Sequence, residues 1–543
     1  MKIKHIIPFI YLLCLSLAIS AQPGKGTYDV YTFGAKGDAK TMDTKAIQTA
    51  IDKCHDDGGG KVYLHSGRFL SGTIYLKSNV TLYIEAGSTL LGSDNLDDYP
   101  IIESKYPAYT GEYVTNKMLI YAEDAKNIAI IGRGTIDGRG DDWVKGPYGF
   151  PSFSVRPRII HLRGCENIQV RDITLYNSAS WVQSYQSCRN LLIDGITVDS
   201  RENDDIEGPE RYTNAPGRNC DGLDLVDCEF VRISNCYINS GDDAIVLKSL
   251  SPDEGCKNIT IVNCTVTCHA SGIKIGTETS GAFEDIVVNN CTVYDTWGDA
   301  INVSTVDGAR IERVSISNIS IRNVKGTAIF VRLGSRAKTF RKNVEAKTGI
   351  LKDVLIQNIQ GTRISSGCSI SGLATLPVEN ITLKNINLEF EGGGTANDAD
   401  RVIPENDKAY PSSKRFRGSG ELPTYGFYVR HGKNIRLDGL QLRFTKEDHR
   451  PALQAHNIQE LQINDLQAAG TASSPALIRL EAVQNAMIAH SRPLGPIPVF
   501  LKLTGSDFSD IALVANRLKY AKQTVVTDNE TARSTISDYN TIK

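Results

Sequence analysis

The chain has 543 residues, with 60 lysines and arginines against 62 aspartates and glutamates, so its formal net charge is −2. A nearly neutral chain lacks the cationic excess typical of nucleic-acid binders, and we expect no nucleic-acid partner. Its 47 glycines indicate many turns, and its length suits several ordinary domains or one extended repeat fold.

Residues 1–21 have the features of a signal peptide. Lys2 and Lys4 form a basic start, and the apolar run over 6–19 ends in small residues. This run is too short to span a membrane comfortably, and no later stretch is apolar enough to insert into one. We therefore expect an exported protein, periplasmic or secreted, whose mature chain is a single domain over 22–543.

A short helix is predicted next, beginning at Asp43 or Thr44 and ended by the glycines at 58–60. The residues that would form its apolar face are Ile47, Ala50, Ile51 and Cys54. Such a helix could cover the open end of a solenoid, which otherwise presents an unpaired edge.

A short pattern then recurs along the chain: a polar residue, an aliphatic, any residue and another aliphatic. It starts at residues 167 and 190, and again at 258, 285 and 313, with neighbouring units 23 to 28 residues apart. Alternation of period two predicts strands with one buried face, and units too short to bury a core must stack. We therefore predict an all-β fold, a single-stranded right-handed parallel β-helix with a short N-terminal capping helix. Its C-terminal coils from about residue 425 continue the solenoid.

One position of the repeat holds cysteine or isoleucine. Cys236, Cys264 and Cys291 stand where other units have isoleucine, so cysteine behaves there as a small buried hydrophobe, and a disulfide framework is the weaker interpretation. Asparagine recurs in the position before it, a residue that tolerates turn geometry and can stack as an amide ladder. These asparagines are Asn235, Asn263, Asn290, Asn318, Asn358 and Asn385.

Two segments about one coil apart carry acidic groups. They are Asn219-Cys220-Asp221 and Gly241-Asp242-Asp243, and 21 residues separate Asp221 from Asp242. Adjacent strands lie about 4.8 Å apart, so these carboxylates should converge. Glycoside hydrolysis needs one protonated and one ionised carboxyl group, and crowding raises the pKa of at least one. The pairing of the two segments favours a catalytic group over a solvated turn. Asp224, three residues after Asp221, would face the other way on a regular strand.

These segments resemble glycoside hydrolase family 28, the polygalacturonase-like pectin hydrolases. Members of that family typically carry Asn-Thr-Asp, Gly-Asp-Asp, Gly-His-Gly and Arg-Ile-Lys along successive coils. Segments 33–44 and 134–138 are also similar to these pectinases, and the resemblance covers about residues 28–390. It implies a pectic polysaccharide or oligosaccharide as substrate. It also implies that Asp242 is the general acid, and that Asp221 and Asp243 hold and deprotonate water, with inversion at the anomeric carbon.

The chain departs from the family at the residues that contact substrate. Ser271 stands at the family histidine, with His269 two residues earlier, and Ala300-Ile301-Asn302 replaces Arg-Ile-Lys. The family cations bind galacturonate, so their loss favours a rhamnogalacturonan or a branched pectic fragment over plain polygalacturonan. The substrate-binding candidates are Asn219, Lys274, Lys248, His269, Ser271 and Arg332.

The candidates differ in what supports them. Lys274 follows Gly272 by two residues and Lys248 follows Asp242 by six, so each could share a face with the site. His269 is a better candidate for local hydrogen bonding than for catalysis. Arg332 opens a basic segment that fits a solvated loop as well as a substrate clamp.

Other functions stay open at this point. The sequence has no metal or nucleotide signature, so no metal or cofactor is expected. A polysaccharide lyase or a non-catalytic glycan-binding β-helix is the alternative, and the three aspartates favour the hydrolase. A β-helix needs no partner, so we expect a monomer. Inserted loops at 201–218 and 392–423 could wall off one end of a groove and decide between cleavage at chain ends and within the chain.

Overall fold

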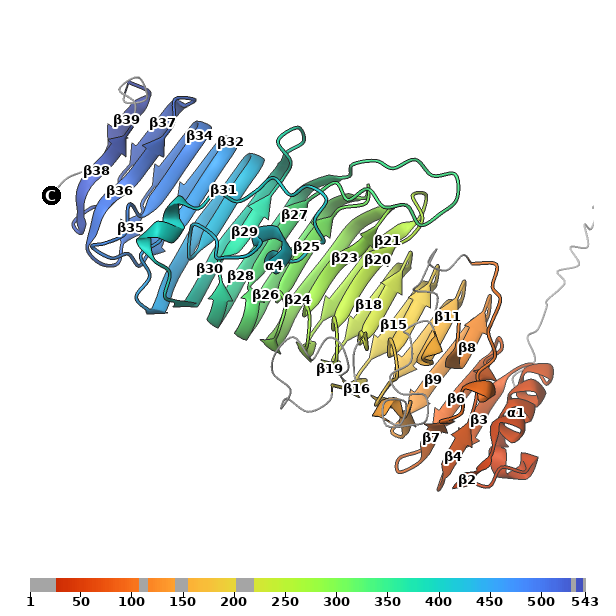
Figure 1. Cartoon of the computed structure of the whole chain (residues 1–543). Coiled ribbons are helices and arrows are strands. Elements are labelled where there is room, and N and C mark those ends of the chain that lie inside the picture. The colour runs from red at the N-terminus through yellow and green to blue at the C-terminus, as the bar shows by residue number, and fades with distance from the viewer. Residues whose placement is uncertain (1–25, 107–115, 142–154, 202–218, 529–533, 541–543) are drawn as a thin grey trace, which may run out of the picture.

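The computed structural model describes residues 26–106, 116–141, 155–201, 219–528 and 534–540. In these ranges the chain winds into one right-handed parallel β-helix, elongated along its axis (Figure 1). The fold predicted from the repeat is confirmed. The signal peptide predicted for 1–21 lies outside the described residues.

Each early coil contains three short strands, and strands in equivalent positions pair in parallel from coil to coil. What we call the first sheet consists of β5 (Ile74–Tyr75), β8 (Met118–Glu123), β11 (Arg158–Arg163), β14 (Gln183–Gln186), β17 (Leu223–Val226), β20 (Ile245–Ser249), β23 (Ile273–Thr279), β25 (Ile301–Thr305), β27 (Ile329–Leu333) and β29 (Cys368–Ser371). The second consists of β1 (Thr27–Asp29), β3 (Gly60–Leu64), β6 (Val80–Ile84), β9 (Lys126–Gly132), β12 (Glu166–Arg171), β15 (Arg189–Asp194), β18 (Glu229–Ser234) and β21 (Gly255–Val262). The third consists of β2 (Asp38–Met42), β4 (Arg68–Ser71), β7 (Thr89–Gly92), β10 (Thr135–Asp137), β13 (Thr174–Tyr176), β16 (Thr197–Ser200), β19 (Tyr237–Ser240) and β22 (Thr265–Cys268).

From β24 onward the second and third strands of a coil merge. The long strands are β24 (Ala282–Thr296), β26 (Arg310–Thr327), β28 (Ile350–Ser366), β30 (Val378–Gly392) and β31 (Phe427–Lys446). Parallel pairing then continues through β32 (Leu453–Asn464), β33 (Gln467–Ala468), β34 (Ile478–Ala489), β35 (Arg492–Pro493), β36 (Ile497–Thr504), β37 (Ser509–Val514), β38 (Ala521–Thr527) and β39 (Ile536–Tyr539). The solenoid and its main apolar core thus extend past residue 425.

The helix expected near the start is α1 (Thr44–Asp56), and its buried face is the one predicted. It packs against β1, β3 and β5 at the end of the ladder (Figure 1), where it covers the open core. Asp43 occupies the N-cap position, but its carboxylate accepts backbone hydrogen bonds from Lys36 (2.7 Å) and Gly37 (2.9 Å) instead of capping the helix. Asp43 therefore holds the turn before β2 against the helix start.

The interior is a continuous apolar column. Every described cysteine is buried and free, and all of them except Cys220 belong to this column. Asn263 donates to Asn235 (3.3 Å), and Asn290 donates to Asn263 (2.7 Å). All three have φ between 55° and 57°, the left-handed region that asparagine tolerates better than most residues. The interpretation of cysteine as a core residue and of asparagine as a turn ladder is confirmed.

One described segment departs from the repeat, and we call residues 393–426 the cover segment. Gly367 alone joins β28 to β29, but the equivalent junction one coil later, between β30 and β31, contains the whole cover segment. It includes η4 (Ala396–Asp400) and α4 (Ser413–Arg417), and Figure 1 shows α4 in front of the strands near β25 and β29.

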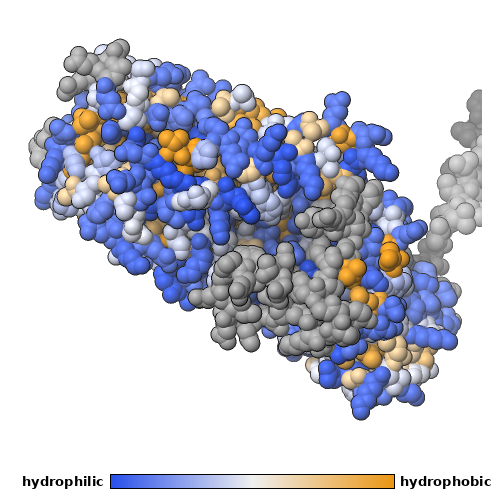
Figure 2. Space-filling model, in the orientation of Figure 1, coloured by the Kyte–Doolittle hydropathy of each residue, from blue (hydrophilic) through white to orange (hydrophobic). Residues whose placement is uncertain are grey.

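The surface is mainly hydrophilic, with scattered hydrophobic residues (Figure 2). Isolated exposed hydrophobic residues are normal on soluble domains and need no partner. Among the described residues, no helix combines the length and apolar character needed to cross a membrane.

Candidate active site

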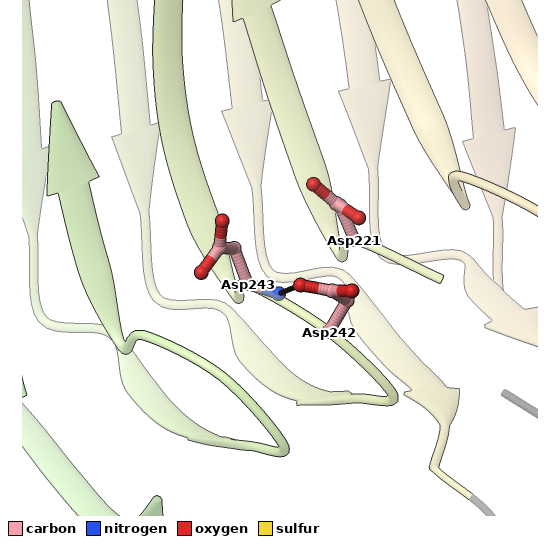
Figure 3. A group of neighbouring side chains, drawn as sticks. All are labelled: Asp221, Asp242 and Asp243. Carbon is pink, nitrogen blue, oxygen red and sulfur yellow. Dashed lines mark hydrogen bonds between the residues drawn. The ribbon is translucent and has the colours of Figure 1, made fainter. Parts of the chain in front are cut away.

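Three aspartates meet at the start of neighbouring strands of the first sheet. Asp221 precedes β17, and Asp242 and Asp243 precede β20 in the next coil. Because β17 and β20 pair in register, the Gly222 N–H donates to the Asp243 carbonyl (2.9 Å) and fixes the two turns side by side. Each aspartate places a carboxylate oxygen within 4.8 Å of the others (Figure 3). The convergence expected from their spacing is what the structure shows.

The three carboxyl groups differ in environment. Asp221 and Asp243 are 4% and 3% exposed, whereas Asp242 is half-buried. Burial, together with the charge of Asp243, raises the pKa of Asp242 to about 6. Burial also raises the pKa of Asp221 well above its usual range. The backbone N–H of Asp243 donates to Asp242 Oδ1 (2.9 Å) and orients that carboxyl group.

Lys274 on β23 is the counter-ion of Asp243. Its Nζ lies 2.7 Å from Asp243 Oδ2, and both side chains are buried. Burial alone would lower the pKa of Lys274, but the Asp243 carboxylate outweighs it and raises the pKa. Asp243 also accepts the backbone N–H of Ser271 at Oδ1 (2.9 Å). The Asp243 carboxylate is thus held in place by an ammonium and an amide donor.

Lys248 on β20 holds the other side of the site. Its Nζ lies 3.5 Å from a carboxylate oxygen of Asp221, of Asp224 and of Glu278. The same ammonium stands 4.7 Å from the centre of the Trp181 ring. The buried Lys248 ammonium thus faces three acids at once and supplies positive charge to the site.

Asp224 lies on the same side of the first sheet as Asp221, which corrects the expectation that it faces away. That expectation assumed a regular strand from 221 to 224, but β17 begins only two residues after Asp221. The chain bends at Gly222, where a Cβ would come within 2.7 Å of the Ala244 carbonyl oxygen. Burial raises the pKa of Asp224 to about 7. Asp224 is therefore one of the three acids around Lys248, together with Asp221 and Glu278.

Sequence reasoning missed Arg158 and Trp181. The Arg158 guanidinium stacks on the Trp181 ring at 4.2 Å, and Nη1 donates to Ser184 (2.8 Å). Both belong to coils before the aspartates, and neither forms a motif with neighbours in the chain. A lone arginine and a lone tryptophan carry no spacing signal, so only the stacking of coils reveals them.

The other substrate-binding candidates divide into two groups. Asn219 accepts a hydrogen bond from Arg156 (3.2 Å), beside Asp221, and Ser271 reaches the site through its backbone. His269 lies two residues earlier, and its backbone N–H donates to the Ser240 carbonyl (3.1 Å). These residues surround the aspartates.

Arg332 is not brought to the aspartates. It lies on β27, three strands beyond β20 in the first sheet, so about 14 Å separates the two strands. Its side chain is buried beneath the cover segment, donates to the Asn406 carbonyl and stacks 5.0 Å from the Phe416 ring centre. Arg332 thus holds the cover segment.

Asn302 occupies the place of the lysine in the family's Arg-Ile-Lys motif. It pairs in register with Lys274, one strand further along the first sheet. Its amide donates to Asp299 Oδ2 (3.0 Å) and to the Pro411 carbonyl (3.1 Å). The position that would carry a cation therefore binds the cover segment instead.

The aspartates are also the described group whose oxygens lie close enough to share a metal ion. Carboxylate oxygens suit hard cations such as calcium. Here Lys274, 2.7 Å from Asp243, and Lys248, 3.5 Å from Asp221, bring positive charge to the group from the protein itself.

Comparisons with known proteins show the family and the fold of the chain. Residues 68–405 match the family described as glycosyl hydrolases family 28. A probable polygalacturonase from Vitis vinifera is 27% identical over 66% of this chain and 73% of its own. An alpha-L-rhamnosidase from Aspergillus niger is 25% identical over 72% of this chain and 91% of its own. A hyperthermoactive exopolygalacturonase from Thermotoga maritima has the same fold, with a TM-score of 0.52 and 22% identity over 67% of this chain and 87% of that one.

Proposed function

The chain belongs to glycosyl hydrolases family 28, and from that premise we propose that it hydrolyses a glycosidic bond in a pectic polysaccharide or oligosaccharide. The observation that carries the proposal is the convergence of three carboxyl groups within 4.8 Å of one another, in unequal surroundings. One partly protonated and one ion-paired carboxyl group are what acid–base hydrolysis requires.

In the proposed reaction Asp242 is the general acid. Its pKa of about 6 leaves a useful fraction protonated near neutrality, and its half-buried position opens it to the leaving oxygen. Asp221 and Asp243 hold the attacking water between them. Asp243, with Lys274 as its counter-ion, takes the proton of that water. The water oxygen bonds to the anomeric carbon, the glycosidic bond breaks, and the leaving oxygen takes the proton of Asp242.

Water attack opposite the leaving group inverts the anomeric carbon. Carboxyl groups of inverting glycosidases are generally about 6.5–9.5 Å apart, and the nearest oxygens here are closer than that. NMR of the fresh product decides the matter. An inverted anomer supports water held by Asp221 and Asp243, whereas a retained anomer would make one of them the nucleophile.

We also propose that the substrate is a rhamnogalacturonan or a branched pectic fragment rather than plain polygalacturonan. Ser271, Ala300 and Asn302 stand where the family's substrate-binding histidine and cations would be, and Asn302 is engaged with Pro411. One of the similar proteins is named a rhamnosidase and another a polygalacturonase, which supports a substrate other than plain polygalacturonan as a candidate.

The test is to incubate the purified protein with a panel of pectic polymers and oligosaccharides and to measure new reducing ends. We expect Asp242→Asn to lower the rate about 10²–10⁴-fold, because it removes the proton donor. Asp253→Asn, an exposed acid in the turn after β20, is the matched control and should leave the rate unchanged.

The same assay separates the alternatives. A lyase would yield an unsaturated sugar that absorbs in the ultraviolet, whereas hydrolysis yields none. A glycan-binding protein would bind a polymer and release nothing. Either result would overturn the hydrolase.

We further propose that the protein is exported, with residues 1–21 removed, and works as a monomer. The basic start and short apolar run support export. N-terminal sequencing of protein recovered outside the cytoplasm and light scattering of the purified chain test these two points.

A further inference from the structure

We infer that the cover segment, residues 393–426, closes the first sheet directly beyond the aspartates, so that the enzyme cleaves at the end of a sugar chain and not within it. This inference rests on the proposed function, because it concerns how the same site receives its substrate.

Residues in register along this sheet form a column that leads from the site to the cover segment. Asp224 on β17 pairs with Val246, which pairs with Lys274, then Asn302 and then Phe330. Successive strands are about 4.8 Å apart, so the column advances along the solenoid in small equal steps. A sugar chain bound at the aspartates and directed toward the C-terminal coils would have to pass over Lys274 and Asn302.

The cover segment blocks that path at its first step. Thr277, on the same strand as Lys274, donates to the Tyr410 hydroxyl (2.6 Å), and the Tyr410 ring centre is 5.4 Å from Lys274 Nζ. One strand further, Asn302 donates to the Pro411 carbonyl (3.1 Å). The segment therefore touches the sheet at the strand that supplies the counter-ion of Asp243.

A buried acid fixes the start of α4 at the same place. The Ser413 N–H donates to Asp299 Oδ2 (3.2 Å), and the Ser413 hydroxyl donates to Asp299 Oδ1. Asp299 is 1% exposed and also accepts from Asn302 (3.0 Å). A substrate would have to break this network to reach the coils beyond.

The rest of the segment is seated on an apolar cluster outside the main core. Phe330 on β27 and Tyr428 on β31, which pairs with β29, point outward and pack against Ile403, Phe416 and Leu422 of the segment. These outward positions are apolar and buried because the segment covers them.

Buried cations complete the attachment. Arg430 donates to the Ile403 carbonyl (2.8 Å), and Arg332 donates to the Asn406 carbonyl. Both guanidinium groups lie close to the Phe416 ring, at 5.3 and 5.0 Å from its centre. The segment is thus an integral wall, held along several coils, and not a mobile flap.

The end of the bound chain then lies against Tyr410, whose side chain remains 46% exposed beside the site. This wall also accounts for the missing family cations. Asn302 has no substrate to bind, because the space above it contains Pro411. The site thus recognises the end of a sugar chain at this position, where the family's cations would bind one more uronate.

The first test uses the wild-type enzyme and the pectic polymer that it degrades. Solution viscosity and new reducing ends are followed together, and early products are sized by mass spectrometry. Cleavage at an end should raise the number of reducing ends with little loss of viscosity and yield one short product from the first time point. A steep fall in viscosity with products of mixed length would overturn the inference and leave the proposed function standing. No new reducing end on any polymer would overturn the proposed function, and the inference with it.

A second test asks whether the cover segment is the cause of cleavage at chain ends. Residues 393–426 are replaced by a single glycine, copying the junction that Gly367 makes one coil earlier, and Phe330→Ser with Tyr428→Ser keeps the exposed face polar. We expect the viscosity loss per bond cleaved to rise severalfold. Lys414→Ala, an exposed residue of α4, is the matched control and should behave as wild type. Cooperative thermal unfolding of the shortened chain shows that it is folded, and cleavage by it that stays confined to ends would contradict the inference.

Discussion

Asp243 is paired with Lys274 at 2.7 Å, whereas Asp242, its neighbour in the chain, accepts a single backbone N–H at Oδ1 and is half-buried. Two adjacent aspartates thus have different surroundings because the turn before β20 points them apart. The one held by an ammonium is suited to accept a proton, and the other to donate one. Because both residues are aspartates, residue type alone does not tell which is the acid and which is the base.

The pH dependence of the reaction follows from this difference. Only protonated Asp242 can act as the acid, and its pKa is raised to about 6 by burial and the charge of Asp243, so the rate should fall as pH rises through about 6. The Lys274 ammonium lowers that pKa. Lys274→Met should therefore move the alkaline limb to higher pH and also lower the maximum rate, because Asp243 loses its counter-ion.

The measurement is kcat/KM against pH for the wild type, Lys274→Met and, as the control, Lys414→Met on the exposed face of α4. An alkaline limb that stays in place when Lys274 is removed would argue against Asp242 as the proton donor.

At the scale of single elements, α1 and the asparagine ladder show how local sequence specifies structure. The four apolar residues of α1 recur at helical spacing, and all four are buried. The asparagines recur once per coil, because each coil turns at the same point with positive φ. In both cases the spacing of the residues equals the period of the structure, so each feature can be predicted from the sequence.

We expect Ile51→Ala to destabilise the protein by about 2–5 kcal/mol, because Ile51 is fully buried where α1 covers the core. Thermal unfolding followed by circular dichroism measures the loss. Lys45→Ala on the exposed side of the same helix should change little. Equal effects of the two substitutions would mean that α1 does not seal the core.

Two substitutions at Asn263 separate the contributions of the ladder. Asn263 has φ of 56°, donates to Asn235 and accepts from Asn290. Asn263→Gly loses the amide bonds but keeps the backbone relaxed, whereas Asn263→Ala also places a Cβ in the left-handed region, at about 1–2 kcal/mol. The free energy of unfolding, measured by chemical denaturation, should therefore be highest for the wild type, lower for Asn263→Gly and lowest for Asn263→Ala. Equal values for the two variants would show that the positive φ of this turn costs alanine no stability.

At the scale of the whole molecule, the solenoid brings together residues that the chain keeps far apart. Trp181 and Lys248 meet across three strands, and Asp299 meets Ser413 of the cover segment. A parallel β-helix produces such contacts because each coil lies on the previous one with fixed register. The stability of the fold is accordingly distributed along one core.

The reactivity of the cysteine thiols can be used to test whether this core is packed as described. All eleven described cysteines are buried and free, so thiol reagents should label none of them in the folded protein and all of them after unfolding. Reducing agents should leave the unfolding temperature unchanged. Rapid labelling of the native protein, or a lower unfolding temperature under reduction, would contradict a core packed with free thiols.

The sequence by itself determined the β-helix, its capping helix, the cysteine and asparagine columns and the meeting of Asp221 with Asp242 and Asp243. Each depends on a period, of one coil or one helical turn, that can be counted along the chain. Only the tertiary structure decided that Asp224 faces Lys248, that Arg158 and Trp181 flank the site, and that Arg332 and Asn302 hold the cover segment. These depend on a bend at Gly222 and on where an inserted segment folds back, and neither leaves a periodic signal in the chain.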